Sequence, residues 1–158
     1  MRLDTNVLVY AFISPEFVPK ARKEEWLTLN NNARLLYEDI LAGKHELIIP
    51  STVLIEMAAV ISAMSGEEQA RKDVNNVKNN ALIAYDDPIF TEQAIGHWLA
   101  LKLSGFDTTI ASCAIANNAT LITNDKAFYE KFSPRAEDFG IKVLLFRDLA
   151  DKQIRQLL

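Results

Sequence analysis

Short, almost wholly apolar segments alternate with longer segments of helical character along the chain, and this alternation constrains the fold more than any other feature. Apolar segments bounded by turn residues are typical of strands buried on both faces, and such strands occur in parallel sheets. Parallel strands need long crossover connections, which intervening helices supply. The expected strands are the first residues of the chain, 46–50, 81–85, 120–123 and 141–146. The alternation therefore predicts an α/β domain around a mainly parallel sheet.

Helices are expected between these strands and after the last of them. The predicted segments are 20–43 (one or two helices), 51–64, 67–79, 91–103, 107–118, 124–132 and 147–158. Residues that favour helix N-termini mark three of the starts: Ser51 or Thr52, then Thr91, then Asp107 or Thr108.

The composition is that of an ordinary globular protein, with 49% hydrophobic and 24% charged residues. No apolar run has the length of a membrane span, and the first residues lack the features of a signal peptide. The single cysteine, Cys113, lies in an apolar stretch and is interpreted as a small core residue. We therefore expect a single domain over residues 1–158, located in the reducing cytoplasm and without contact to a membrane.

The formal net charge of −4 argues against binding nucleic acid by bulk electrostatic attraction alone. A local basic rim around an acidic site remains compatible with this charge. The two loose basic clusters, residues 20–23 and 71–72, are interpreted as solvated helix faces rather than phosphate clamps.

The opening residues, MRLDTNVLVY, place one aspartate, Asp4, inside a run that otherwise favours a buried strand. Burying a carboxylate without a partner is costly. If the first strand ends early, Asp4 lies just beyond its carboxyl end, and residues 5–12 continue as a helix or turn. The alternation along the chain favours this second interpretation.

Three other acids fall at comparable places, and ligand sites of open α/β sheets form beyond the carboxyl ends of strands. Asp125 follows the strand 120–123, and Asp107 begins the helix before that strand. Glu56 interrupts the apolar helix that follows strand 46–50. Asp4, Asp107 and Asp125 could each simply cap a helix, but capping does not explain Glu56 or the shared location. We therefore expect the four acids to form one site.

Carboxylates gathered in one crevice repel one another, so either their pKa values rise or cations bind. Oxygen donors without His or Cys favour Mg²⁺ or Mn²⁺ over zinc. His45 and His97 lack a ligand-spaced partner and are interpreted as surface or packing residues. Carboxylate-held Mg²⁺ keeps positions open for water and phosphate, which suits phosphodiester hydrolysis. Without metal, at least one of these acids should titrate well above the ordinary aspartate range.

Several motifs, taken in order, resemble the PIN domain ribonucleases, and particularly the VapC-type toxins of prokaryotic toxin–antitoxin systems. They are LDTNVLVYAF (3–12), STVLIEMAAVIS (51–62) with its glutamate, and GFDTTIASCAIANNATLITNDKAF (105–128). Together they span residues 1 to about 132, most of the chain. The resemblance implies a three-layer α/β/α fold with a mainly parallel five-stranded sheet.

The resemblance also implies an endoribonuclease that cuts RNA with Mg²⁺ or Mn²⁺, a small antitoxin partner and a homodimer. It assigns metal binding and catalysis to Asp4, Glu56, Asp107 and Asp125. Asn6 and Thr123 match polar positions that support these acids.

The chain departs from the compact toxin pattern by its extra residues near 13–33 and 65–80, and by Ala127 where many relatives carry a further acid. The alanine puts a second metal site in doubt, and the extra segments make the RNA substrate and the partner the least transferable expectations. Two alternatives stay open: a stand-alone RNA-processing PIN nuclease, and a non-catalytic PIN-like RNA-binding or assembly module.

Two other α/β classes also place acids at strand ends, and both are disfavoured. Asn6 stands where a haloacid-type phosphatase needs a second aspartate, and FRDLA (146–150) lacks the lysine of a receiver domain.

Overall fold

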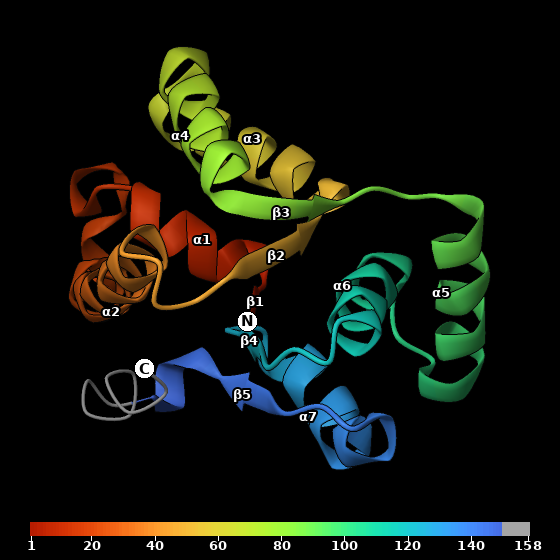
Figure 1. Cartoon of the computed structure of the whole chain (residues 1–158). Helices are drawn as coiled ribbons and strands as arrows, with labels where there is room; N and C mark the ends of the chain where they lie inside the picture. Colours follow the sequence, from red (N-terminus) through yellow and green to blue (C-terminus); the bar gives the residue numbers. More distant parts are fainter. Residues whose placement is uncertain (150–158) are drawn as a thin grey trace.

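A computed structural model describes residues 1–149 (Figure 1). Its strands are β1 (Arg2–Leu3), β2 (Leu47–Pro50), β3 (Ala81–Ala84), β4 (Leu121–Thr123) and β5 (Val143–Leu145). Every strand pairing is parallel: β1 with β4, β4 with β5, and β2 with β3. The backbone N–H of Ile48 donates to the carbonyl of Met1 at 3.1 Å and so joins the two ladders. The strands therefore follow the order β3-β2-β1-β4-β5.

Helices cover both faces of the sheet in a three-layer α/β/α arrangement, as the sequence predicts. They are α1 (Thr5–Phe12), α2 (Lys23–Leu41), α3 (Ser51–Ser65), α4 (Glu67–Asn80), α5 (Pro88–Leu101), α6 (Gly105–Ala116) and α7 (Lys126–Ala136). Along the chain, α1 packs on α2, α3 on α4, and α5 on α6. Short 3₁₀ turns occupy Pro15–Phe17, Lys20–Arg22, Glu137–Phe139 and Phe146–Asp148. The C-terminal helix expected over 147–158 lies for the most part outside the described residues.

The predicted helix starts are wrong at α5 and α6, because a residue upstream provides the cap. Asp87 accepts a hydrogen bond from the backbone N–H of Phe90 at 2.8 Å, so α5 begins before Thr91, with a proline at its first position. Ser104 accepts from the backbone N–H of Asp107 at 3.1 Å, so α6 begins at Gly105 and Asp107 lies in its first turn. Asp87 and Ser104 are both of residue types that favour the N-cap position, as are the predicted caps that follow them. Residue type alone therefore does not indicate which of two nearby residues caps the helix.

The start of α3 also differs from the prediction. Pro50 occupies the N-cap position, and no side chain caps this helix. Ser51 is the first helical residue rather than the cap, and Thr52 follows it inside the helix. The chain therefore passes from β2 into α3 without a loop.

The core lies between the sheet and the helices. Cys113 is fully buried in it, in line with its apolar surroundings in the sequence. His97 of α5 packs edge-on against Phe139 and shares a hydrogen bond of 2.9 Å with Ser112 of α6, so it is a packing residue. The guanidinium of Arg2 is buried and contacts the thiol of Cys113, and burial lowers the pKa of Arg2.

Within residues 1–149, no single helix is both long and apolar enough to cross a membrane. In this part of the chain, one pair of helices, α5 and α6, reaches that length and apolar content when taken together, and the two are bent by 110°.

Candidate active site

Asp4 lies where the chain leaves the sheet and enters α1. Its backbone N–H donates to the carbonyl of Ile122 in β4 at 3.0 Å, as a strand residue does, whereas its side chain interacts with the first turn of α1. The carboxylate Oδ1 accepts from the backbone N–H of Thr5 at 2.6 Å and so caps α1. An anion is favourable at this position because helix N-termini carry unpaired N–H groups and a partial positive charge. The early end of the first strand is confirmed, against the strand propensity of the residues that follow.

Two further side chains hold the other oxygen of this carboxylate. Thr123, at the end of β4, donates its hydroxyl to Asp4 Oδ2 at 2.5 Å, and Asn6 donates its amide to the same oxygen at 3.1 Å. Asn6 accepts from the backbone N–H of Asn124 at 3.0 Å, and Thr123 accepts from that of Asp125 at 3.0 Å. Asn6 and Thr123 therefore connect Asp4 to the loop between β4 and α7.

Burial raises the pKa of Asp4 to about 6, and it is the largest influence on this group. Hydrogen bonds from Thr123 and from the backbone of Thr5 oppose the increase, whereas the nearby charges of Glu56 and Asp107 add to it. The direction agrees with the expectation that one acid titrates high in the absence of metal. The main cause is desolvation, and repulsion between the acids contributes less.

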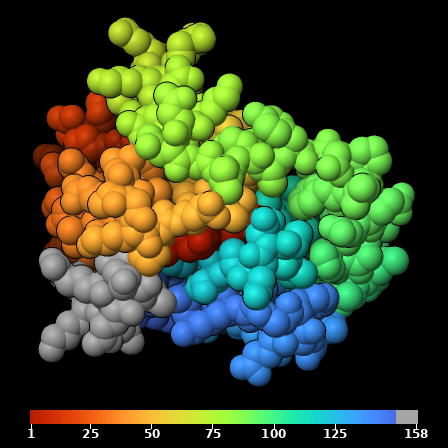
Figure 2. All heavy atoms as spheres, in the orientation of Figure 1, coloured from red at the N-terminus to blue at the C-terminus, as the bar shows by residue number. Residues whose placement is uncertain are grey.

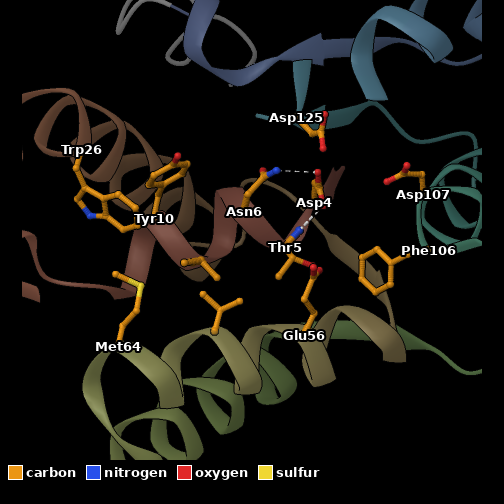
Figure 3. Close-up of a pocket in the computed structure, with 12 residues that line it drawn as sticks. Asp4, Thr5, Asn6, Tyr10, Trp26, Glu56, Met64, Phe106, Asp107 and Asp125 are labelled. Atoms are coloured by element: carbon orange, nitrogen blue, oxygen red, sulfur yellow. Dashed lines mark hydrogen bonds between the residues drawn. The ribbon is translucent and has the colours of Figure 1, made fainter. Parts of the chain in front are cut away.

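All four acids expected from the sequence line one cleft of about 300 Å³. In Figure 3, Asp4 lies between the other three, with Glu56 on one side and Asp125 on the other. Glu56 comes from α3 and is exposed, and Asp107 comes from the first turn of α6 and is half-buried. Asp125 precedes α7 and is exposed. The fold therefore brings together acids from four separate parts of the chain.

Asp107 and Asp125 also have local structural partners. Asp125 caps α7 by accepting from the backbone N–H of Phe128 at 3.0 Å. Asp107 accepts from the hydroxyl of Ser104 at 2.7 Å, which completes a reciprocal interaction at the start of α6. A capping role is thus real for Asp4 and Asp125, but it coexists with their place in the cleft.

The donor chemistry of the cleft fits a hard divalent cation, because every candidate ligand is a carboxylate oxygen. The negative charges of Glu56 and Asp107 add to the increase in the pKa of Asp4 that burial causes, so a cation in the cleft would relieve part of it. Among residues 1–149, no three acidic, histidine or cysteine side chains are placed closely enough to hold a metal ion together. Coordination by three or more of these acids therefore requires side-chain rotation, for which the exposed Glu56 and Asp125 have room.

Sequence reasoning missed the apolar part of the cleft. Tyr10, Trp26 and Met64, here called the aromatic end, lie at the opposite end of the cleft from Asp107 (Figure 3). Trp26 belongs to a segment that was expected only to be helical. Its place beside α1 depends on how two helices pack, and no local signal in the sequence encodes it.

Comparisons with known proteins identify the family of the chain. Residues 1–131 match the PIN domain family. The crystal structure of VapBC2 from Rickettsia felis, bound to a DNA fragment from their promoter, is similar at 26% sequence identity and a TM-score of 0.58. The alignment covers 90% of this chain and 96% of that chain. No curated protein matches.

The family match ends at residue 131, but the described fold continues beyond it. The last strand, β5, pairs with β4 over Leu121–Val143, Ile122–Leu144 and Thr123–Leu145, and so completes the same sheet. PIN domains are generally nucleases, and PIN nucleases generally use divalent metals such as Mg²⁺. From its matched residues, its three-layer fold and its structural neighbour, the chain belongs to the PIN domain family and is VapC-like.

Proposed function

We propose that this protein is a metal-dependent endoribonuclease that hydrolyses RNA phosphodiester bonds and is the toxin of a VapBC-type pair. One observation carries the proposal: carboxylates from four parts of the chain line a single cleft around the buried Asp4. The proposed ligands of Mg²⁺ or Mn²⁺ are Asp4, Glu56, Asp107 and Asp125. The proposed location is the cytoplasm, where a lone thiol such as Cys113 stays reduced.

In this proposal, some residues of the cleft bind the metal and others position those ligands. Asp4 is held by hydrogen bonds on both oxygens and provides the fixed ligand. Glu56 and Asp125 are exposed to the cleft and provide ligands that adjust to the cation and the phosphate. When bound, the metal polarises the phosphate and activates a water molecule for attack. Asn6 and Thr123 act as positioning residues, because they orient Asp4 and connect it to the backbone of the Asp125 loop.

The proposed partner is a small antitoxin protein. Support comes from the likeness to VapBC2 over nearly the full length of that chain. The alternative is a stand-alone RNA-processing nuclease with the same cleft. A neighbouring upstream gene for a small DNA-binding protein that co-purifies with this chain would support the toxin assignment, and its absence would favour the alternative.

Cleavage of RNA in the presence of Mn²⁺ tests the proposal directly. We expect Asp4→Asn and Glu56→Gln each to reduce cleavage by about 100-fold or more. Glu56 is the sharper test, since its side chain is exposed and we expect its replacement to leave the fold intact. Glu130→Gln on the outer side of α7 is the matched control and should cleave normally.

Equal cleavage by all variants would show that the activity does not belong to this cleft. If the protein binds RNA and no tested RNA is cut, the non-catalytic alternative is favoured.

We also propose that the protein is a homodimer held through α5. This helix carries one Asp, Glu, Lys or Arg residue, Glu92, whereas helices that are apolar all round are typically buried. It forms the right-hand margin of the molecule in Figure 2, with no other element outside it in that view. Ile95, Trp98 and Leu99 share one face and are 44–58% exposed. In a two-fold dimer the same patch of both copies forms the interface. An apolar patch can pair with itself in this way, because it needs no charges of opposite sign on its partner.

Light scattering tests the dimer. The wild-type protein is expected to have the mass of two chains, and Leu99→Glu that of one, because a buried carboxylate opposes association. A wild-type protein that is strictly monomeric at high concentration would reject the homodimer. The exposed Leu27→Glu on α2 is the control and should leave the mass unchanged.

A further inference from the structure

The aromatic end of the cleft has a defined geometry. The rings of Tyr10 (α1) and Trp26 (α2) are in contact, with centroids 4.5 Å apart and planes at 64°. Both side chains are partly exposed, and Met64 of α3 lies beside them in the same cavity. Figure 3 shows Asn6 between Tyr10 and Asp4, and Val9 and Val60 also line the cavity. An aromatic surface and a group of acids thus share one continuous cavity.

Hydrogen bonds hold both aromatic side chains in place. The indole N–H of Trp26 donates to the carbonyl of Ile13 at 3.3 Å, and the hydroxyl of Tyr10 accepts from the amide of Asn124 at 3.2 Å. Asn124 directly precedes Asp125, so Tyr10 is tied to the loop that carries an acid of the site. The polar atoms of both rings are therefore engaged, and apolar ring surface remains for a ligand. Rings held in advance lose little conformational freedom on binding.

The charge of the protein indicates what such a surface contributes. With a net charge of −4 and four acids in the cleft, the protein does not attract a phosphate backbone by electrostatics alone. Contacts that do not depend on charge would therefore add to the affinity for RNA that local basic side chains or a bound cation supply. Stacking of bases on aromatic side chains is such a contact, and it is used where single strands are bound.

We propose that Trp26 and Tyr10 form a stacking subsite for one nucleobase of single-stranded RNA, next to the phosphate at the acids. This inference rests on the proposed ribonuclease function and adds a substrate-binding position to it. An unpaired base fits this role because a base inside a duplex is already stacked on its neighbours. The subsite thus makes single-stranded RNA the preferred substrate.

The two tryptophans of the chain, Trp26 and Trp98, allow a direct measurement. In a Trp98→Phe background, Trp26 is the single tryptophan and reports on its own surroundings. A Glu56→Gln substitution in the same protein, in Mg²⁺, prevents cleavage during the titration. The probes are a short single-stranded RNA and an RNA of equal length with abasic positions. We expect the intact RNA to change the Trp26 fluorescence at saturation and the abasic RNA to leave it unchanged.

Substitutions at position 26 then separate stacking from a general apolar contact. Trp26→Leu keeps apolar volume without an aromatic face and should weaken binding of the intact RNA by about 10-fold. Trp26→Phe should retain most of the affinity, and neither change should affect the abasic RNA. Phe17→Leu, at an exposed aromatic outside the cleft, is the matched control. Thermal unfolding of each variant verifies the fold, and Tyr10→Leu repeats the test from the second ring.

Three results would overturn the subsite. The first is equal affinity for intact and abasic RNA, and the second is unchanged RNA binding by Trp26→Leu. The third is that Trp26→Leu loses affinity for a protein partner but still binds RNA, which would assign this surface to that partner. In each case, RNA cleavage by the wild-type protein would leave the ribonuclease proposal standing. Conversely, RNA binding that depends on Trp26 but leads to no cleavage would reject the catalytic proposal and retain the subsite.

Discussion

The acidic part of the cleft has a floor and a rim, and they are built differently. The floor consists of Asp4, Asn6 and Thr123, whose hydrogen bonds of 3.1 and 2.5 Å connect the start of α1 to the end of β4. The rim consists of Glu56, Asp107 and Asp125, which reach the cleft from other elements with their side chains at least partly exposed. The floor residues are therefore constrained by folding as well as by the proposed function. For the rim, the proposed function is the stronger constraint, most clearly at Glu56.

The largest expected effect concerns the charge of Asp4 in metal-free protein. Its pKa is about 6 in the folded protein, against an ordinary value of 3.8. The folded state therefore binds the proton more tightly, and this contribution to stability is complete below pH 3.8 and lost as pH rises through 6. Relative to Asp4→Asn, the wild-type protein should lose about 2 kcal/mol between pH 4 and pH 7. Urea unfolding of both proteins in EDTA measures this difference.

The comparison between the two proteins isolates Asp4 from the other titrating groups. If the unfolding free energies of wild type and Asp4→Asn run parallel from pH 4 to pH 7, the carboxylate is not buried as described. Mg²⁺ should restore stability to the wild-type protein at pH 7 and have a smaller effect on the variant, because binding to the folded state alone is stabilising.

An effect of equal or smaller size is expected from the hydroxyl of Thr123. Thr123→Val keeps the shape of the side chain but leaves an oxygen of buried Asp4 and the backbone N–H of Asp125 without this partner. We expect a loss of about 1–3 kcal/mol at pH 7, measured by urea unfolding. Thr123→Ser should retain most of the stability. Thr28→Val on the exposed side of α2 is the control, and an equal effect at both positions would remove the distinction of the floor.

The smallest effect on stability is expected at the rim. Glu56→Gln should change the free energy of unfolding by no more than about 0.5 kcal/mol, because the side chain is exposed. Thermal unfolding of the metal-free protein measures this change. A destabilisation as large as that of Thr123→Val would mean that Glu56 supports the fold, and the floor and rim would then not differ in kind.

Local sequence patterns predict the strands, most helices and the four acids, and the predictions that are wrong concern the first residues of helices. The spacing of apolar residues indicates the strands and most helices. Asp4 and Asp125 are recognised as site residues because each follows an expected strand. Helix starts were less certain, because Asp87 and Ser104 compete as caps with the residues that follow them. Choosing among adjacent caps depends on where the incoming chain is directed, which the wider fold decides.

The sequence by itself determined the order of elements, the α/β class and the acids at strand ends, because these follow from periodicity and residue type over a few positions. Tertiary structure alone decided the burial of Asp4, its hydrogen bond to Thr123 and the contact of Tyr10 with Trp26. Asp4 contacts Thr123 because β1 pairs in parallel with β4. This pairing places the residue after β1 beside the last residue of β4, although the two are far apart in the sequence. Such contacts depend on pairing and packing between distant segments, and no short stretch of sequence encodes them.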